Sequence, residues 1–293
     1  MPPLGHNNSV SFLPDCTVYD EVNKNITENN STLSDICIEF KSRAEEDAFL
    51  TDFTDERSSI SSPTQFVSRK PKGLITASQI TTYAALQLDC QYCTHVFSVL
   101  IVRNYTWLIQ WDWSGAIVTT PIYYQQDPAL LDFFTLYDQA VRLMRGRDDS
   151  VRGATQAETL KAFHANKEFH ISQDLLIVTI PLQGHKSECG KYIIKPPVAQ
   201  FYTPPGHATR TSIAYDIQRN HIIFFKDSWR VACDGIKKEG ELYTILNCTC
   251  IHNVPHCSAS GDIGKGIYHS TCTSQFANAP WVLTSSKHEF TPH

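Results

Sequence analysis

The fold of the second half of the chain depends on two apolar runs, Ile213-Ala-Tyr-Asp216 and Ile222-Ile-Phe-Phe-Lys226. The polar turn Gln218-Arg219-Asn220 separates them. Runs of bulky apolar residues that are separated by a short polar turn are typical of a β-hairpin. The sequence therefore predicts a hairpin whose second strand ends at Lys226.

A helix is predicted shortly after this hairpin. The turn Glu239-Gly-Glu241 precedes Leu242-Tyr-Thr-Ile-Leu246, in which the apolar residues recur three and four positions apart, as they do on one face of a helix. A lysine on a strand and a glutamate on the next helix can meet as an ion pair. We expect Lys226 to pair with Glu241. Glu239 is the alternative partner, because the sequence predicts the start of the helix only to within a residue or two.

Three segments carry a family resemblance: Phe225-Lys-Asp-Ser-Trp-Arg230, the Glu239-Gly-Glu241 turn and His252-Asn-Val-Pro255. They resemble the fungal-type protein kinase family of mushroom-forming fungi, and the resemblance spans residues 12 to 283. Four more segments are similar to that family: Thr94-His-Val-Phe-Ser-Val-Leu-Ile101, Leu108-Ile-Gln-Trp-Asp112, Ser114-Gly-Ala-Ile-Val-Thr119 and Gln275-Phe-Ala-Asn-Ala-Pro-Trp281.

The resemblance implies ATP and Mg²⁺ as cofactors and a protein Ser or Thr hydroxyl as phosphate acceptor. Lys226, held in place by Glu241, would bind the α and β phosphates, and Gly206 would lie in a phosphate loop at Pro205–Thr211. Ala208 and Thr211 stand where that loop would need further glycines, since a Cβ keeps backbone N–H groups away from phosphate oxygens.

The catalytic motifs of a kinase are missing after Lys226. The 67 residues that follow it contain neither a His-Arg-Asp catalytic loop nor an Asp-Phe-Gly motif, which supply the base and the metal ligands. We expect a truncated kinase homologue, a pseudokinase that is inactive alone, so its standing as an enzyme stays open. The alternatives are a non-catalytic binding or scaffold protein and a metal-dependent nuclease-like module.

The first half of the chain predicts an α/β module. Ile36–Lys41 alternates apolar and polar residues as a strand does, and Thr76–Leu88 has helical spacing with Thr76 or Ser78 as cap. Three further strands are predicted at Thr94–Val102, Tyr105–Trp111 and Ala116–Tyr123, and the short turns between them predict a meander. A second helix is predicted at Ala129–Met144.

A nuclease-like arrangement is the second resemblance, within that first module. Pro14-Asp15, then Glu39-Phe-Lys41 on a strand and Gln87 on a helix, resemble the order of the PD-(D/E)xK fold. Two carboxylates can bind Mg²⁺ while a lysine positions the attacking water. We expect Glu39 and Lys41 to share one strand face, and Asp15 to be held too loosely to complete a metal site.

Composition and charge place limits on function. The net charge of −5 gives no basic field for nucleic acid, so we do not expect a nucleic-acid partner. No apolar run reaches the ~20 residues of a membrane span, and the first residues lack signal-peptide character, which predicts a soluble intracellular protein of cytoplasm or nucleus. Cys90-x-x-Cys93 and Cys248-x-Cys250 do not have the paired spacing of a structural zinc site.

The fold class that follows is α+β in four parts. Residues 1–35 form a loosely ordered arm, residues 36–150 the α/β module with a mixed or antiparallel meander, residues 151–190 a connector, and residues 191–293 a kinase-like small lobe with an antiparallel sheet and one helix. Leu242, Ile245 and Leu246 should pack on that sheet. The apolar strip from Phe276 to Leu283 should bind a protein partner or a second copy of the chain.

Overall fold

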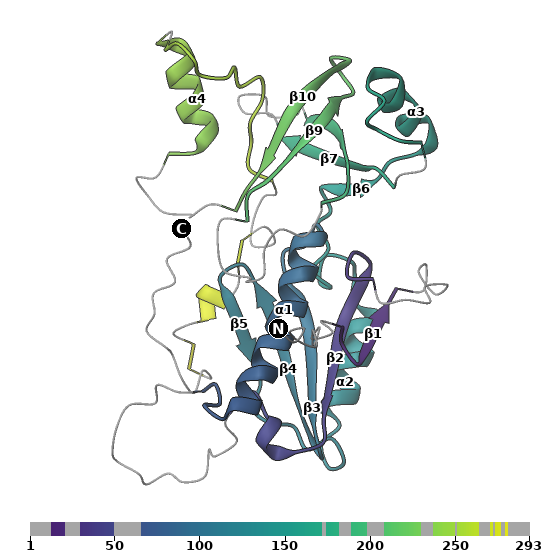
Figure 1. The fold of residues 1–293 in the computed structure, drawn as a ribbon, viewed down its shortest axis with the longest axis vertical. Coiled ribbons are helices and arrows are strands. Elements are labelled where there is room, and N and C mark those ends of the chain that lie inside the picture. Colours follow the sequence, from purple (N-terminus) through teal and green to yellow (C-terminus); the bar gives the residue numbers. More distant parts are fainter. Residues whose placement is uncertain are drawn as a thin grey trace, which may run out of the picture.

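The computed structural model describes residues 13–20, 30–49, 66–171, 174–181, 189–197, 208–229, 237–249, 251–263, 270–271, 273–276 and 279–280. These residues form two five-stranded sheets with four α-helices, so the α+β class is confirmed (Figure 1). No helix in this part of the chain is long and apolar enough to cross a membrane.

The first sheet is mixed and follows chain order from edge to edge. Its strands are β1 (Cys16–Tyr19), β2 (Ser34–Lys41), β3 (Val96–Val102), β4 (Tyr105–Asp112) and β5 (Gly115–Val118). Strand β2 is parallel to β3, and the other neighbours are antiparallel. The predicted meander of three strands is therefore present, and the parallel pair requires a crossover connection.

Helix α1 (Pro71–Cys90) makes that crossover and packs on one face of the first sheet (Figure 1). It begins five residues before the predicted Thr76, because Lys70 has an extended N-cap conformation and Pro71 has the fixed φ that suits a first helical turn. Thr76 is buried inside the helix instead of capping it. Ile80 and Leu88 contribute to a core cluster with the fully buried Trp107 of β4.

The opposite face of the first sheet is covered by α2 (Ala129–Gln139) (Figure 1). Tyr137 and Phe133 pack in one cluster with Ile36 and Ile38 of β2. The helix ends before the predicted Met144, because Ala140 already has an extended backbone. A short 3₁₀ helix, η2 (Ala44–Glu46), follows β2.

The second sheet is an antiparallel meander. Its elements are β6 (Val151–Gly153), α3 (Gln156–Ala165), β7 (Leu176–Pro181), β8 (Cys189–Ile194), β9 (Arg210–Asp216) and β10 (His221–Asp227). Strands β9 and β10 are the predicted hairpin. The predicted connector, residues 151–190, is instead part of this unit, because it supplies β6, α3, β7 and the first residues of β8.

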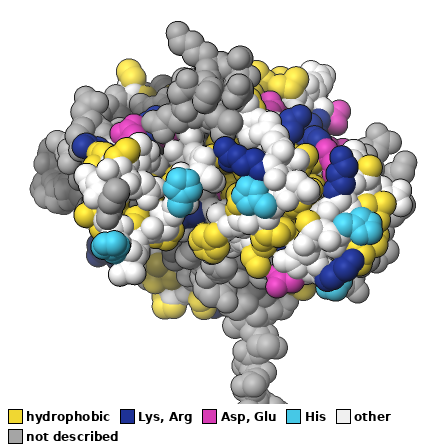
Figure 2. Space-filling model, turned by 90° about the horizontal axis from the view of Figure 1, so that it is seen from above, with side chains coloured by type: hydrophobic (Ala, Val, Ile, Leu, Met, Phe, Trp, Pro, Cys, Tyr) yellow, Lys and Arg dark blue, Asp and Glu magenta, His cyan; other side chains and the backbone are white. Residues whose placement is uncertain are grey.

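Helix α4 (Glu239–Cys248) stands away from the second sheet (Figure 1). None of its residues is buried, and Leu242, Ile245 and Leu246 are 37–44% exposed, so the prediction that they pack on the sheet is wrong. Figure 2 shows that exposed hydrophobic side chains on the face carrying this sheet are interspersed with Lys, Arg and His.

The 3₁₀ helix η4 (Thr273–Phe276) lies against the first module, where the Asp112 carboxylate accepts the N–H of Thr273 at 2.9 Å. Phe276, the first residue of the predicted apolar strip, is 37% exposed. Most of the strip lies outside the described residues, so its role in association stays a prediction.

The base of the β9–β10 hairpin joins the two sheets. Ala208 is buried in the core cluster of the first module, and Trp229 packs against the same cluster. Between them, the Arg210 guanidinium donates to the Leu88 carbonyl at 2.6 Å and lies 3.8 Å from the Asp227 carboxylate. The second sheet is thus anchored at the C-terminal end of α1.

Candidate metal centre

Strand β2 carries two charged side chains that the sequence singled out. Glu39 is 3% exposed, and its Oε1 atom lies 2.5 Å from the Lys41 ammonium. The same ammonium donates to Gln79 Oε1 of α1 at 3.1 Å. Residues i and i+2 of a strand point to the same face, so the prediction that Glu39 and Lys41 share a face, here the one covered by α1, is confirmed.

Asp15 is fixed beside these residues. Its Oδ2 accepts the Phe40 N–H at 2.9 Å. The expectation that Asp15 is loosely held is therefore wrong. The reason is that β1 pairs with β2 in the register Cys16↔Ile38, which brings the residue before β1 next to the end of β2.

Tyr83 of α1 lies at the same place, and its hydroxyl donates to the Leu13 carbonyl at 3.0 Å. Burial raises the pKa of Tyr83, and the negative charges of Glu39 and Asp15 raise this pKa further. The phenol therefore stays neutral. The Tyr83 hydroxyl therefore lies within the electrostatic reach of both carboxylates.

Gln79 and Tyr83 are the site residues that sequence reasoning missed. They are four residues apart and so lie on one face of α1, the face next to β2. That spacing was the available signal, but the strand that the helix covers could not be read from the sequence.

Gln87, the helix residue expected at the site, lies at the other end of β2. It is fully buried, and its amide donates to the carbonyls of Ser34 and Asp35 at 3.2 and 3.3 Å. Because α1 runs antiparallel to β2, later helix residues lie nearer the start of the strand. Gln87 therefore belongs to the structural network in which Arg147 pairs with Asp35.

One atom of the cluster has no partner. Glu39 Oε2 is buried without a hydrogen-bond donor among the described residues. Leaving a buried carboxylate oxygen unpaired is costly, and such an atom often marks an absent ion or water. Two carboxylates fit Mg²⁺, which takes oxygen ligands, uses one or two carboxylates and keeps several waters.

No group of three or more His, Cys, Asp or Glu side chains is placed to hold a metal within the described ranges. Cys90 and Cys93 are both buried, and burial raises the pKa of Cys93 to about 11. These cysteines therefore serve as small core residues.

Lys226 forms its ion pair with Glu239 instead of Glu241. Its ammonium lies 2.7 and 2.8 Å from the two carboxylate oxygens of Glu239. Glu239 is the first residue of α4, and Glu241 projects roughly 200° further round the helix, because successive residues turn by about 100°. The two side chains are 40% and 46% exposed, so the pair is a surface ion pair.

The proposed phosphate loop cannot be compared with the structure at its glycine, because Gly206 lies outside the described residues. Ala208, where the loop would need a glycine, has a left-handed φ of 40° and is buried in the core of the first module. Its side chain thus serves packing between the two sheets.

Comparison with known proteins gives no relative for this arrangement. No protein-family model, no curated protein and no solved structure matches the chain.

Proposed function

We propose that the first module binds Mg²⁺ through Asp15 and Glu39 and hydrolyses a phosphodiester bond. The observation that carries this proposal is the buried, unpartnered Oε2 of Glu39, next to an ammonium and near a second carboxylate. A resident cation would give this oxygen the partner that the protein does not supply.

Each side chain has a role that follows from its contacts. Bound Mg²⁺ would polarise a phosphoryl oxygen and lower the pKa of a coordinated water. Lys41 uses two of its three N–H donors on Glu39 and Gln79, so the third can reach a phosphate oxygen or the attacking water. Tyr83, kept neutral by its raised pKa, adds no charge of its own to the site.

Cleavage of a fluorescent single-stranded oligonucleotide tests this proposal. We expect the purified chain to cleave it only with Mg²⁺ or Mn²⁺, and Glu39→Gln and Asp15→Asn to lower the rate at least 100-fold. Glu45→Gln is the matched control, since Glu45 is a half-exposed carboxylate of η2 that pairs with Lys72. Isothermal titration with Mn²⁺ gives a second readout, in which only the first two variants should lose binding.

Two results would refute the phosphodiesterase proposal. One is a folded wild-type chain that neither binds Mn²⁺ nor cleaves. The other is cleavage that survives Glu39→Gln, because a buried metal ligand cannot be replaced by an amide without loss of affinity.

Nucleotide binding at the second sheet is a second candidate, and the order of β8, β9, β10 and α4 with the Lys226–Glu239 pair supports it. This is the order in which a kinase small lobe presents its strand lysine and helix glutamate. We expect weak ATP binding that Lys226→Met reduces, without transfer of phosphate to a protein. Labelled phosphate transfer that Lys226→Met abolishes would contradict this candidate.

A further inference from the structure

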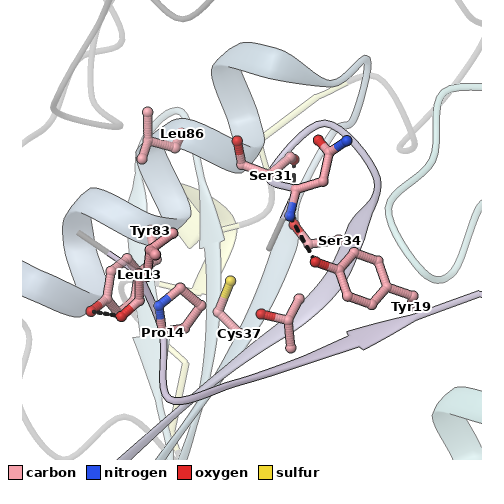
Figure 3. Close-up of a pocket in the computed structure, with 10 residues that line it drawn as sticks. Leu13, Pro14, Tyr19, Ser31, Ser34, Cys37, Tyr83 and Leu86 are labelled. Atoms are coloured by element: carbon pink, nitrogen blue, oxygen red, sulfur yellow. Dashed lines mark hydrogen bonds between the residues drawn. The ribbon is translucent and has the colours of Figure 1, made fainter. Parts of the chain in front are cut away.

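A small pocket lies between the β1–β2 pair and α1, beside Tyr83 and Cys37 (Figure 3). Its cavity volume of about 90 Å³ is well below the ~300–1,000 Å³ of ordinary ligand pockets. The second sheet offers a larger binding surface, because β10 is one of its two edge strands (Figure 1). None of the described segments pairs with the outer edge of β10.

The hydrogen bonds of the neighbouring strands show which backbone groups of β10 face outward. The Ile217 N–H donates to the Lys191 carbonyl, so the odd-numbered residues of β9 face β8. Successive residues of a strand direct their backbone groups to opposite sides, so the even-numbered residues of β9 face β10. Their partners are the odd-numbered residues of β10. The N–H and C=O groups of Ile222, Phe224 and Lys226 therefore point away from the sheet.

Strand β10 itself has none of the features that usually protect an edge. Exposed edges of natural sheets are interrupted by a bulge, a proline or several charges. The register of β10 with β9 is regular over all seven residues, and the strand contains no proline. Phe224, at its centre, is 72% exposed. An edge of this kind is a template for an added strand.

Helix α4 adds an apolar strip beside this edge. Lys226 and Phe224 lie on the same face of the sheet, since they are two residues apart, and Lys226 contacts Glu239 at the start of α4. Leu242 and Leu246 follow Glu239 by three and seven residues, so they lie on its side of the helix. Both leucines are exposed. A strand added to β10 would direct every second side chain to the face on which Phe224 and these leucines lie.

The charges at this surface are already paired. The Lys226 ammonium is held by Glu239, and Lys238 lies 2.7 Å from the Asp262 carboxylate. These two lysines leave no net positive charge to attract a polyanion such as nucleic acid. The surface therefore fits a ligand that is uncharged and partly apolar.

A second copy of the chain fits less well than a peptide. The seven residues of β10 extend about 24 Å at ~3.4 Å each, and a sheet is about 10 Å thick, so two paired edges would bury roughly 500 Å² in total. Stable protein interfaces bury about 1,200 Å² or more. A single peptide strand can instead use the edge and the strip on α4 together.

We propose that the outer edge of β10 binds an extended, uncharged peptide segment of another protein, with apolar side chains at alternate positions. The segment lies antiparallel to β10, as all neighbours in this sheet do, and becomes its sixth strand. It exchanges backbone hydrogen bonds with Ile222, Phe224 and Lys226, while its apolar side chains cover Phe224 and pack against the leucines of α4. The metal centre of the first module takes no part in this contact.

The probe is a capped seven-residue peptide in which threonine alternates with valine, threonine first, so that three valines can face residues 222, 224 and 226. Two methylated versions form a matched pair. N-methylation of two valines removes N–H groups that would bond to β10, whereas N-methylation of two threonines removes N–H groups that point away. Isothermal titration of the full chain should show at least tenfold weaker binding of the valine-methylated peptide.

Two substitutions test the two parts of the surface. Phe224→Pro removes an outward N–H and no hydrogen bond to β9, so it should abolish peptide binding in a chain that circular dichroism shows to be folded. Leu242→Ser should weaken binding at least fivefold, while Leu131→Ser, at an exposed leucine of α2, should leave it unchanged. The methylated peptides require no change in the protein, so they decide the question even where a variant is unstable.

Amide hydrogen exchange gives an independent readout. In the free chain, the amides of residues 222, 224 and 226 should exchange at least 100-fold faster than those of 223 and 225, and the peptide should slow them at least tenfold. The proposal is overturned if no peptide binds up to about 1 mM, if binding survives Phe224→Pro, or if the methylated peptides bind equally or in reversed order. It is also overturned if light scattering shows a dimer whose edge amides are already protected, because the occupant is then a second copy.

Discussion

Replacement of Arg210 by methionine should destabilise the protein by about 3–5 kcal/mol, because removal of one partner from a buried ion pair leaves the other charge uncompensated. Arg210 is 9% exposed, and its guanidinium is held by Leu88 and Asp227 and by the rings of Tyr92 and Trp113 at 4.7 and 5.9 Å. The lost charged hydrogen bond contributes about 1.5–3 kcal/mol of this cost.

Urea unfolding followed by tryptophan fluorescence measures the loss. The double variant with Asp227→Asn completes a thermodynamic cycle and should recover part of the stability, since it removes the carboxylate that Arg210→Met leaves uncompensated. The cost of Arg210→Met should also be smaller near pH 4, where the raised pKa lets Asp227 take up a proton. A cost below ~1 kcal/mol, or one that does not change with pH, would refute this account of how the sheets are joined.

Three further predictions concern single positions. Lys226→Met should lower the free energy of unfolding, measured by thermal denaturation, by less than ~1 kcal/mol, because the ion pair of Lys226 with Glu239 is exposed. A loss of several kcal/mol would show that the pair is buried in solution. Gly146→Ala should lower the free energy of unfolding by more than ~2 kcal/mol, because φ is +89° and a Cβ would lie 2.0 Å from the His95 carbonyl oxygen. Gly153→Ala is the control, since a Cβ there meets open space and should change stability by less than ~0.5 kcal/mol. Equal costs for the two variants would contradict this prediction. Burial raises the pKa of Asp227, so the stability from the protonated group is present below the ordinary carboxyl pKa and is lost as pH rises through the raised value. The stability of the wild type relative to Asp227→Asn should therefore fall as pH rises above roughly pH 4, and a constant difference from pH 3 to pH 8 would count against this account.

The β9–β10 hairpin was predictable because its signals are local. Both apolar runs and the turn lie within about 20 residues, and Asn220 at the turn tolerates its left-handed φ of 55°. Helix α1 and the β3–β5 meander were likewise read from periodicity and short turns, whereas the parallel pairing of β2 with β3 was not. The far edge of the same sheet was not predictable, because β6 has three residues and no periodic pattern.

The candidate site was partly predictable for a related reason. Glu39 and Lys41 share a strand, so their common face follows from spacing alone. Asp15 joins them because β1 pairs with β2, and a strand of only four residues does not reveal its pairing register in the sequence. Gln79 takes the place expected for Gln87, because the sequence does not determine which turn of α1 lies beside the end of β2. Lys226 pairs with Glu239 instead of Glu241 because the start of α4 decides which glutamate faces the strand.

Ala208 and Trp229 have a consequence for synthesis of the chain on the ribosome. They pack against the same core as Trp107, yet they follow the last helix of the first module by many residues. Translation adds about 5–20 residues per second, and ~80 residues separate the start of the second sheet from Trp229. Synthesis of that segment therefore takes roughly 4–16 s, during which the core of the first module is incomplete. The nascent first module therefore exposes part of its apolar interior throughout that interval, and chaperone binding during elongation should end when residue 229 leaves the exit tunnel.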